Sequence, residues 1–204
     1  MVFFLCIDRR IYGFLIAGEI LKIWLPIIVM FSVYQEPKVI KNFITKEYCD
    51  EIRKISKPHL KSSSVSSCDI IDETFRKSKS VGLVDEFINK PIIERCNSIL
   101  GHDKSIFEPL HIVKYEPGDF YNPHFDSSPV IVRPYTFIIT LNDNYKGGET
   151  YFPNLDKYYK LGKGDALFFH NYTTNRLETK LSLHGGKEVL SGEKWIANIW
   201  VSSL

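Results

Sequence analysis

The sequence is poor in cysteine and has no Cys-x-x-Cys pair. Its four cysteines are Cys6, Cys49, Cys68 and Cys96. The missing pair argues against a zinc ribbon and against a thioredoxin-like redox site, because both need closely spaced thiols. Free cysteines are commonly buried in protein cores, and this is the interpretation we favour. A disulfide of Cys68 in an oxidising compartment is the alternative that the sequence leaves open.

A long uncharged apolar segment is also missing. The apolar residues 11–34 are interrupted by Glu19 and Lys22, and their uncharged part, residues 23–33, is short. A membrane-spanning helix needs about twenty mostly apolar residues and tolerates charges poorly near its centre. The N-terminal segment therefore does not predict a clear membrane span.

Three interpretations of this hydrophobic segment, residues 1–34, stay open, and we favour association with a membrane. The first is a signal-anchor, with Arg9 and Arg10 on the cytosolic side and the rest of the chain in the endoplasmic reticulum lumen or at its membrane. The second is a signal peptide, although no small-residue cleavage site follows it. The third is an over-extended start, with Met30 as the true first residue. Without a signal-anchor we expect a cytoplasmic protein.

Basic stripes and internal repeats are absent too. The 204 residues carry a formal net charge of +2, and lysine and glutamate are mixed throughout. Proteins that bind nucleic acid usually carry a basic patch or stripe, so we expect no nucleic-acid partner. The length suits one domain with an additional segment, and we assign residues 39–204 to that domain.

Residues 39–80 predict a short strand, a helix and a loop. The apolar run 39–44 suits a strand, and Thr45 can cap the helix that follows it. Apolar residues then recur at helical spacing as far as Pro58, which should end the helix. Residues 61–80 are rich in serine and show no periodicity, so we expect a mobile loop there.

A second helix is expected over residues 84–100. From Ile92 onward its apolar residues line one face, which indicates packing against the outside of a sheet. Proline is tolerated best in the first turn of a helix, so we expect the firm part of this helix to begin at Pro91. Gly101 is suited to end it, because glycine readily adopts the left-handed conformation found after a helix.

From Leu110 the pattern changes to short strands separated by glycine, proline and asparagine. The predicted strands lie near residues 110–115, 120–125, 135–141, 150–152, 165–170, 182–184, 187–190 and 194–201. Many short strands joined by tight turns favour a double-sheet jelly roll. We therefore predict a mainly β fold with flanking helices, in which N-terminal helices pack on a jelly-roll core at residues 110–201.

The segment Tyr121–Asp126 carries the most specific chemical signal. His124 and Asp126 are two residues apart, so an extended strand directs both side chains to one face. This pair leaves a divalent metal short of ligands, and His184, within Leu-His-Gly-Gly, is the best candidate for a third. Two histidines and one carboxylate form the facial triad of non-haem iron(II) oxygenases, which leaves open positions on the metal.

Further sequence blocks accompany these residues in a fixed order. They are Tyr115 and Gly118 before the pair, Gly-Gly-Glu-Thr at 147–150, and Lys194 ten residues after His184. With these blocks the chain resembles the prolyl 4-hydroxylase branch of the iron(II)/2-oxoglutarate-dependent dioxygenases. The resemblance is strong from about residue 110 to residue 201 and extends more faintly back to residue 39.

The resemblance implies a double-stranded β-helix fold and an enzyme that uses iron(II), 2-oxoglutarate and L-ascorbate. The implied site residues are His124, Asp126 and His184 for the metal, and Lys194, Tyr115 and Thr140 for 2-oxoglutarate. A carboxylate buried without a paired cation costs several kcal/mol, so Lys194 would pair with the distal carboxylate of 2-oxoglutarate. On its strand Lys194 shares one face with Ile196, Asn198 and Trp200, so all four should point inward together.

The implied reaction consumes O2 and 2-oxoglutarate, hydroxylates an unactivated C–H bond, and releases succinate and CO2. The implied partner is a proline-containing peptide or protein, hydroxylated at C4 of proline in Pro-rich or collagen-like chains. Arg76 and Ser78 fall where the family tends to have an Arg-x-Ser in its peptide-binding region.

Two departures from the family pattern concern the substrate groove rather than the metal. Lys187 stands where the family often has cysteine, and the loop 172–180 lacks the expected prolines. The same chemistry on a lysyl residue, a free amino acid or a nucleobase therefore stays open. A non-catalytic jelly-roll binding module is a further alternative, although such a module would not need Lys194 and Tyr115.

Overall fold

The computed structural model describes residues 33–65, 70–101 and 106–202. Residues 1–32 and Cys68 lie outside these ranges. The interpretations of the N-terminal segment, including membrane association and location, therefore stay predictions, as does a Cys68 disulfide. Within the described ranges no helix is both long and apolar enough to cross a membrane. Cys49 and Cys96 are buried free thiols, which confirms the preferred interpretation for these two residues.

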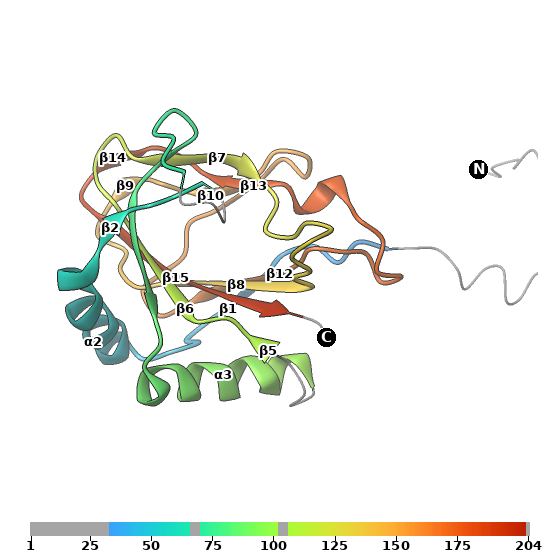
Figure 1. The fold of residues 1–204 in the computed structure, drawn as a ribbon, viewed down its shortest axis with the longest axis horizontal. Helices are drawn as coiled ribbons and strands as arrows, with labels where there is room; N and C mark the ends of the chain where they lie inside the picture. The colour runs from blue at the N-terminus through green and yellow to red at the C-terminus, as the bar shows by residue number, and fades with distance from the viewer. Residues whose placement is uncertain (1–32, 66–69, 102–105, 203–204) are drawn as a thin grey trace, which may run out of the picture. The chain divides into compact units, whose positions relative to one another are not determined.

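The larger of two facing sheets carries the smaller sheet on one face and the helices on the other (Figure 1). In spatial order its strands are β1 (Lys38–Ile40), β12 (Ala166–His170), β8 (Tyr135–Thr140), β15 (Lys194–Ser202), β6 (Leu110–Tyr115), β4 (Lys79–Leu83) and β2 (Lys61–Ser62), with β5 (Ile106–Phe107) beside β15. The smaller sheet consists of β11 (Lys157–Tyr159), β10 (Thr150–Phe152), β13 (His184–Gly186), β7 (Phe120–His124) and β3 (Arg76–Lys77). Two further strands, β9 (Lys146–Gly147) and β14 (Val189–Ser191), pair with each other. This arrangement confirms the predicted jelly roll.

Strand β15 contributes side chains to both faces of the larger sheet. Trp195 and Ile199 belong to the core between this sheet and the helices. Ile196 belongs to the second core, which fills the space between the two sheets. Because side chains alternate along a strand, Lys194 and Trp200 share the inner face with Ile196, as predicted. Lys194 is only 4% exposed, so a charged side chain lies inside the jelly roll.

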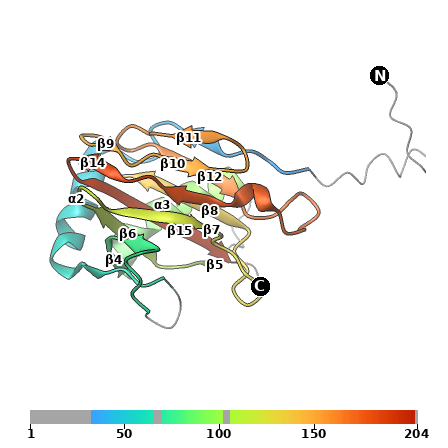
Figure 2. The ribbon, with the colours of Figure 1, turned by 90° about the horizontal axis from the view of Figure 1, so that it is seen from above.

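Two helices, α2 (Lys46–Ser56) and α3 (Glu86–Leu100), pack on the outer face of the larger sheet. Ile52 of α2 and Ile92 of α3 are fully buried in the outer core. Burial of an isoleucine side chain stabilises a fold by about 1.5–3 kcal/mol. The view from above shows how the strands of the smaller sheet lie over those of the larger one (Figure 2). The helices therefore cover only the outer face of the larger sheet, and its inner face is available for a functional site.

The ends of α2 follow the predicted signals closely. Thr45 caps the helix, since its hydroxyl oxygen accepts a hydrogen bond from the backbone N–H of Tyr48 at 3.2 Å. The α-helix ends at Ser56, and Pro58 lies within the 3-10 turn η2 (Lys57–His59) that follows. Proline thus ends the regular α-helix slightly earlier than its own position, because it has no backbone N–H to continue the helical hydrogen bonds.

The start of α3 differs from the prediction. The helix begins at Glu86, and Pro91 lies inside it rather than in its first turn. Asp85 provides the cap, because its carboxylate accepts a hydrogen bond from the backbone N–H of Phe87 at 2.9 Å. Pro91 has no N–H to bond the carbonyl of Phe87 four residues earlier, and Phe87 lies on the exposed side of the helix, 91% exposed. Gly101 ends the helix with φ +75°, as predicted.

The prediction of a structureless loop over residues 61–80 was wrong. This stretch contains β2, β3 and the first part of β4. β4 pairs with β6 in the larger sheet, and β3 pairs with β7 in the smaller sheet. These partners lie far away in the sequence, and the strands themselves carry mostly polar residues. Their conformation is therefore determined by backbone pairing, which leaves no hydrophobic period in the sequence.

The strand predicted at residues 182–184 begins later than expected. Lys180–Ser182 forms the 3-10 turn η3, and β13 starts only at His184. The hydroxyl of Thr179 accepts a hydrogen bond from the backbone N–H of Leu181 and so starts this turn. Apolar residues in such a short turn resemble a strand when only the sequence is considered.

Replacing Asp85 with alanine should lower the free energy of unfolding by about 1 kcal/mol, because the first turn of α3 loses its cap. Urea denaturation at neutral pH measures this difference. Asp85→Asn keeps a capping oxygen and should stay close to the parent protein. Equal destabilisation by both substitutions would contradict the capping role.

Candidate metal centre

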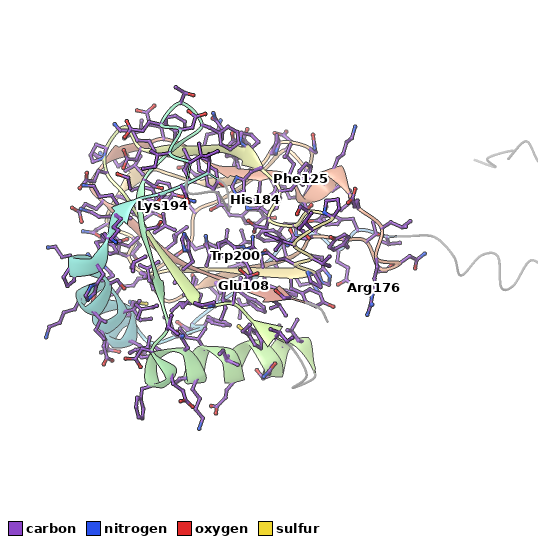
Figure 3. The ribbon with its side chains drawn as sticks, viewed as in Figure 1. Glu108, Phe125, Arg176, His184, Lys194 and Trp200 are labelled. Atoms are coloured by element: carbon purple, nitrogen blue, oxygen red, sulfur yellow. The ribbon has the colours of Figure 1, made fainter. Side chains whose placement is uncertain are left out.

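The pairing of β7 with β13 brings two histidines face to face. His184 lies directly opposite His124 in this antiparallel pair, and Asp126 follows shortly after β7 ends. The Nε2 atoms of His124 and His184 lie 3.7 and 3.6 Å from the two carboxylate oxygens of Asp126. One ligand atom from each residue falls within a cluster no wider than 4.8 Å. Figure 3 shows His184 between the two sheets, on the strand beside β7.

Backbone carbonyls orient both imidazoles. Nδ1 of His124 lies 2.9 Å from the carbonyl oxygen of Asn122, and Nδ1 of His184 lies 3.0 Å from that of Ser182. Only a protonated nitrogen can donate to a carbonyl, so Nδ1 carries the proton in both rings. Each Nε2 therefore keeps a lone pair directed at the shared centre, which is the tautomer a metal ligand requires.

Aromatic rings enclose the two histidines. Tyr121 stacks on His124 with ring centroids 3.6 Å apart and an interplanar angle of 16°. Phe152 and Phe169 pack against His184, with ring centroids 5.4 and 4.7 Å from the imidazole. Rings packed in this way have little freedom to rotate, so the ligand geometry is held before any ion binds.

The glycine after His184 is required by close backbone packing. A Cβ atom on Gly185 would lie 2.8 Å from the carbonyl oxygen of Tyr121 and 2.9 Å from the ring of Tyr151. Contacts this short would push β13 away from β7. The Gly-Gly sequence therefore permits the strand approach that sets His184 opposite His124.

The protonation states suit a cation. Burial and the neighbouring imidazole of His184 lower the pKa of His124 well below its usual value. Burial acts to raise the pKa of Asp126, but the facing imidazoles and the hydroxyl of Thr136 together hold it below its usual range. At neutral pH the cluster thus offers a neutral imidazole at His124 and an ionised carboxylate at Asp126, the forms that bind a divalent metal. The donor set fits iron(II).

Two residues that the sequence did not single out support the carboxylate. The hydroxyl of Thr136 on β8 donates to Oδ2 of Asp126 at 2.8 Å. The side-chain amide of Asn171 donates in turn to the hydroxyl oxygen of Thr136 at 2.9 Å and to the carbonyl of Arg133 at 2.9 Å. A threonine in a strand is indistinguishable from a simple β-former in the sequence, so no local pattern identifies this relay.

The structure brings together the three residues predicted to contact 2-oxoglutarate. Lys194 on β15 pairs with Tyr115 on β6, and Ile196 on the same strand pairs with Thr140 on β8. Tyr115 and Ile196 belong to the inner core, and Lys194 and Thr140 are each 4% exposed. Tyr115, Thr140 and Lys194 thus lie on three adjacent strands of the larger sheet.

Lys194 is a buried cation without an anion beside it. Its Nζ lies 5.2 Å from the centre of the Tyr115 ring, and it makes no hydrogen bond or ion pair with any residue that the structure describes. Burial lowers the pKa of Lys194 to about 8, although Glu149 acts in the opposite direction. A Cβ atom on Gly148 would lie 3.2 Å from Cδ of Lys194, so the glycine leaves room for this side chain. An unpaired buried ammonium is costly, which indicates space for an anionic ligand.

Arg76 and Ser78, predicted near a bound peptide, lie beside the metal centre. The guanidinium of Arg76 sits 4.6 Å from the ring centre of Tyr121, the residue that stacks on His124. Its Nε donates to the hydroxyl oxygen of Ser78 at 3.1 Å. The position agrees with the expectation, and the role in binding stays a prediction.

Arg133 and Glu108 form a second polar contact with the centre that the sequence did not reveal. Arg133 donates to both carboxylate oxygens of Glu108 at 2.6 Å and to the backbone carbonyl of Asp126 at 3.0 Å. Its guanidinium also lies 4.3 Å from the ring centre of Trp200. Figure 3 shows Glu108 and Trp200 close together below His184, and the backbone N–H of Glu108 donates to the carbonyl of Trp200 at 3.0 Å. Arg133 and Glu108 are 25 residues apart in the chain, so no local sequence motif identifies this ion pair.

Comparison with known proteins assigns this site to a family. Residues 110–202 match the model of the 2OG-Fe(II) oxygenase superfamily. A prolyl 4-hydroxylase homologue of Acanthamoeba polyphaga mimivirus is 35% identical over 181 residues, covering 82% of this chain and 74% of that protein. Prolyl 4-hydroxylase 13 of Arabidopsis thaliana is 29% identical over 189 residues, covering 78% and 68%. The viral collagen prolyl hydroxylase of Paramecium bursaria Chlorella virus 1, solved with 2-oxoglutarate, is similar with a TM-score of 0.71 and 26% identity, covering 83% of this chain and 97% of that one.

Replacing Thr136 with valine should weaken divalent metal binding by roughly tenfold to a hundredfold, because Asp126 loses its orienting hydrogen bond. Calorimetric titration of the metal-free protein with manganese(II) measures the affinity without turnover. Thr136→Ser keeps the hydroxyl and should retain most of the affinity. A valine variant that binds manganese(II) as tightly as the parent protein would remove Thr136 from this role.

Proposed function

Because the chain belongs to the prolyl 4-hydroxylase family of 2-oxoglutarate- and iron(II)-dependent dioxygenases, we propose that it hydroxylates C4 of proline in Pro-rich or collagen-like chains. One observation carries the proposal beyond family membership. The His-Asp-His cluster and an unpaired buried lysine occupy the same interior, between the two sheets. This combination supports a metal that works together with a dicarboxylate cosubstrate.

The proposed roles follow from the geometry of the side chains. His124, Asp126 and His184 would hold iron(II), which with 2-oxoglutarate and O2 supplies the oxidising chemistry and releases succinate and CO2. Lys194 would pair with the distal carboxylate of 2-oxoglutarate. Burial raises the pKa of Tyr115 to about 12, so its hydroxyl stays protonated and able to donate to the same ligand.

The protein's contribution is to bind, orient and exclude water. Val113, Ile138 and Ile196 line the larger sheet within the inner core, opposite Phe152 of the smaller sheet. Water is largely excluded from such a wall, which strengthens the pairing of Lys194 with a carboxylate. Thr136 orients the carboxylate of Asp126, and L-ascorbate would serve as the reductant that keeps the iron in its ferrous state.

A proline-containing peptide or protein is the substrate best supported by the relatives. The mimivirus and Arabidopsis proteins are named for prolyl 4-hydroxylation, and the viral structure for collagen prolyl hydroxylation. These names favour proline over a lysyl residue, a free amino acid or a nucleobase. Arg76 and Tyr121, in contact with each other beside His124, would meet the peptide at the metal.

The alternative of a non-catalytic jelly-roll module is less favourable. A module that only holds a metal gains nothing from a buried, unpaired Lys194, and the burial of this charge reduces stability. This loss of stability is offset when an anionic cosubstrate pairs with the ammonium of Lys194. Lys194 therefore favours an enzyme over a binding module.

Replacing Lys194 with alanine should weaken 2-oxoglutarate binding by about thirtyfold or more, because one partner of a buried charge pair is lost. In the unsubstituted protein the affinity should also fall roughly tenfold between pH 7 and pH 9. The reason is that the free ammonium, with a pKa of about 8, loses its proton over that range. Calorimetry with manganese(II) in place of iron(II) measures both effects.

The alanine variant should lose this pH dependence together with its affinity. Lys187→Ala is a matched control, since Lys187 is exposed and lies over the ring of Tyr151 on the smaller sheet. It should bind 2-oxoglutarate normally. An alanine variant at 194 with unchanged affinity would refute the proposed anchor.

Mass spectrometry of a peptide panel tests the reaction itself. With iron(II), 2-oxoglutarate and ascorbate, proline-containing peptides should gain one oxygen at C4, with equal amounts of succinate released. His184→Ala, which lacks a proposed metal ligand, should form no product. Oxygen added only to lysine or to nucleobases would overturn the substrate assignment, and no succinate under any condition would favour the module.

A further inference from the structure

The carboxylate ligand of the metal cluster lacks the support that fixes the two histidines. His124 and His184 lie on paired strands, so the pairing of β7 with β13 sets the positions of both. Asp126 lies beyond the last residue of β7, in a segment without regular secondary structure. A backbone outside a strand ladder is held only by other contacts, because its polar groups have no ladder partners. The contacts of Asp126 therefore show what keeps this ligand in place.

Arg133 returns to the backbone of Asp126 across a short closed loop. Its guanidinium donates to the backbone carbonyl of Asp126 at 3.0 Å. Its own backbone N–H donates to the hydroxyl oxygen of Ser127 at 2.9 Å. Within the loop, the backbone N–H of Ser128 donates to the carbonyl of Ile131 at 2.9 Å. These bonds fold the loop back on itself and join its last residue to the metal ligand at its start.

Glu108 attaches Arg133 to the larger sheet. Its two carboxylate oxygens accept hydrogen bonds from the guanidinium, each at 2.6 Å. Such a two-point contact fixes the direction of the guanidinium as well as its distance. The carboxylate of Glu108 also accepts a hydrogen bond from the hydroxyl of Ser202 at 3.1 Å. Because Ser202 is the last residue of β15, the guanidinium is tied to the strand that also carries Trp200.

The indole of Trp200 faces the same carboxylate ligand. The ring is held by the guanidinium of Arg133, 4.3 Å from its centre, and by the imidazole of His111, at a centroid distance of 5.4 Å. Its buried N–H makes no hydrogen bond of ordinary length with any residue in the described ranges. It nevertheless lies close enough to Asp126 to help keep the pKa of that carboxyl low. A buried donor without a full partner reduces stability, so this N–H favours a carboxylate turned towards it.

The contacts of Arg133 and the relay through Thr136 meet at one residue. Asn171 donates to the hydroxyl oxygen of Thr136 and to the backbone carbonyl of Arg133, each at 2.9 Å. Thr136 acts on the carboxylate of Asp126, and Arg133 acts on its backbone. The orientation and the position of this ligand thus depend on two separate sets of contacts.

We propose that Arg133 is a positioning residue of the metal centre, which holds the backbone of Asp126 and keeps the indole of Trp200 against its carboxylate. The proposal rests on the metal centre that the proposed function uses. An arginine suits this role because its planar fork bonds a carboxylate and a carbonyl while its face packs on a ring. A lysine ammonium is a point charge and cannot make all three contacts together. Without this hold, Asp126 would shift relative to the two histidines and bind a cation less tightly.

Arg133→Lys tests the proposal, because it keeps the positive charge and loses the fork. Calorimetric titration of the metal-free protein should show about tenfold weaker binding of manganese(II) than in the parent protein. With cobalt(II) as the probe, the visible absorption bands should shift, since these bands report how the ligands are arranged around the ion. A merely structural role would lower stability and leave the cobalt bands of the folded protein unchanged.

Two milder variants separate the contacts of the guanidinium. Trp200→Phe keeps an aromatic ring and removes the N–H, and Glu108→Gln keeps an acceptor and removes the charge. Each should weaken manganese(II) binding about threefold, the effect of losing one modest hydrogen bond, and should shift the cobalt bands. These variants decide the question if Arg133→Lys does not fold.

Arg53→Lys is the matched control. Arg53 lies on α2, where its guanidinium is 5.4 Å from the ring centre of Trp195 and 3.5 Å from the carboxylate of Asp50. This variant loses the same kinds of contact outside the larger sheet and should bind both ions as the parent protein does.

Parental affinity and parental cobalt bands in the folded variants at Arg133, Trp200 and Glu108 would overturn the positioning role and leave the proposed function intact. An equal loss of affinity in Arg53→Lys would overturn it as well. If the unsubstituted protein binds neither ion, the metal centre and the proposed function fail first, and the positioning role fails with them.

Discussion

The antiparallel contact between β7 and β13 is the interaction on which the metal centre depends. It places His184 opposite His124, and it can form only because Gly185 has no side chain to separate the two strands. The strand backbone also supplies the carbonyls of Asn122 and Ser182 that orient both rings. Main-chain geometry thus sets ligand position and tautomer together, and the centre is prepared before a cation arrives.

The second organising feature is the alternation of side chains along β15. Its outward residues, such as Trp195, pack in the core shared with α2 and α3. Its inward residues, Ile196 and Lys194, lie in the space between the two sheets. A helix surface cannot serve two cores in this way, because its apolar stripe faces one side only. The same nine-residue strand therefore connects the stability of the outer core to the position of a buried charge.

Polar groups inside the jelly roll show how such a site is tolerated. Asp126 is satisfied by Thr136, which is satisfied in turn by Asn171, so the carboxylate is held in a fixed orientation. Lys194 has no corresponding partner in the part of the chain that the structure describes. The contrast separates two kinds of buried charge. One, Asp126, is hydrogen-bonded within the protein and oriented as a metal ligand. The other, Lys194, has no anion beside it, and we propose that the cosubstrate pairs with it.

Local patterns were enough to identify the jelly roll, the caps at Thr45 and Gly101, and the pair His124 and Asp126, because these depend on residues adjacent in the chain. Family resemblance added Lys194 and its expected role, and its place on a core-like strand indicated that it points inward. The folded chain was needed for β3 and β4, for the start of β13, and for the contacts of Thr136, since all of these depend on partners distant in the sequence. Backbone pairing and side-chain relays leave no periodic trace in the strands that take part in them.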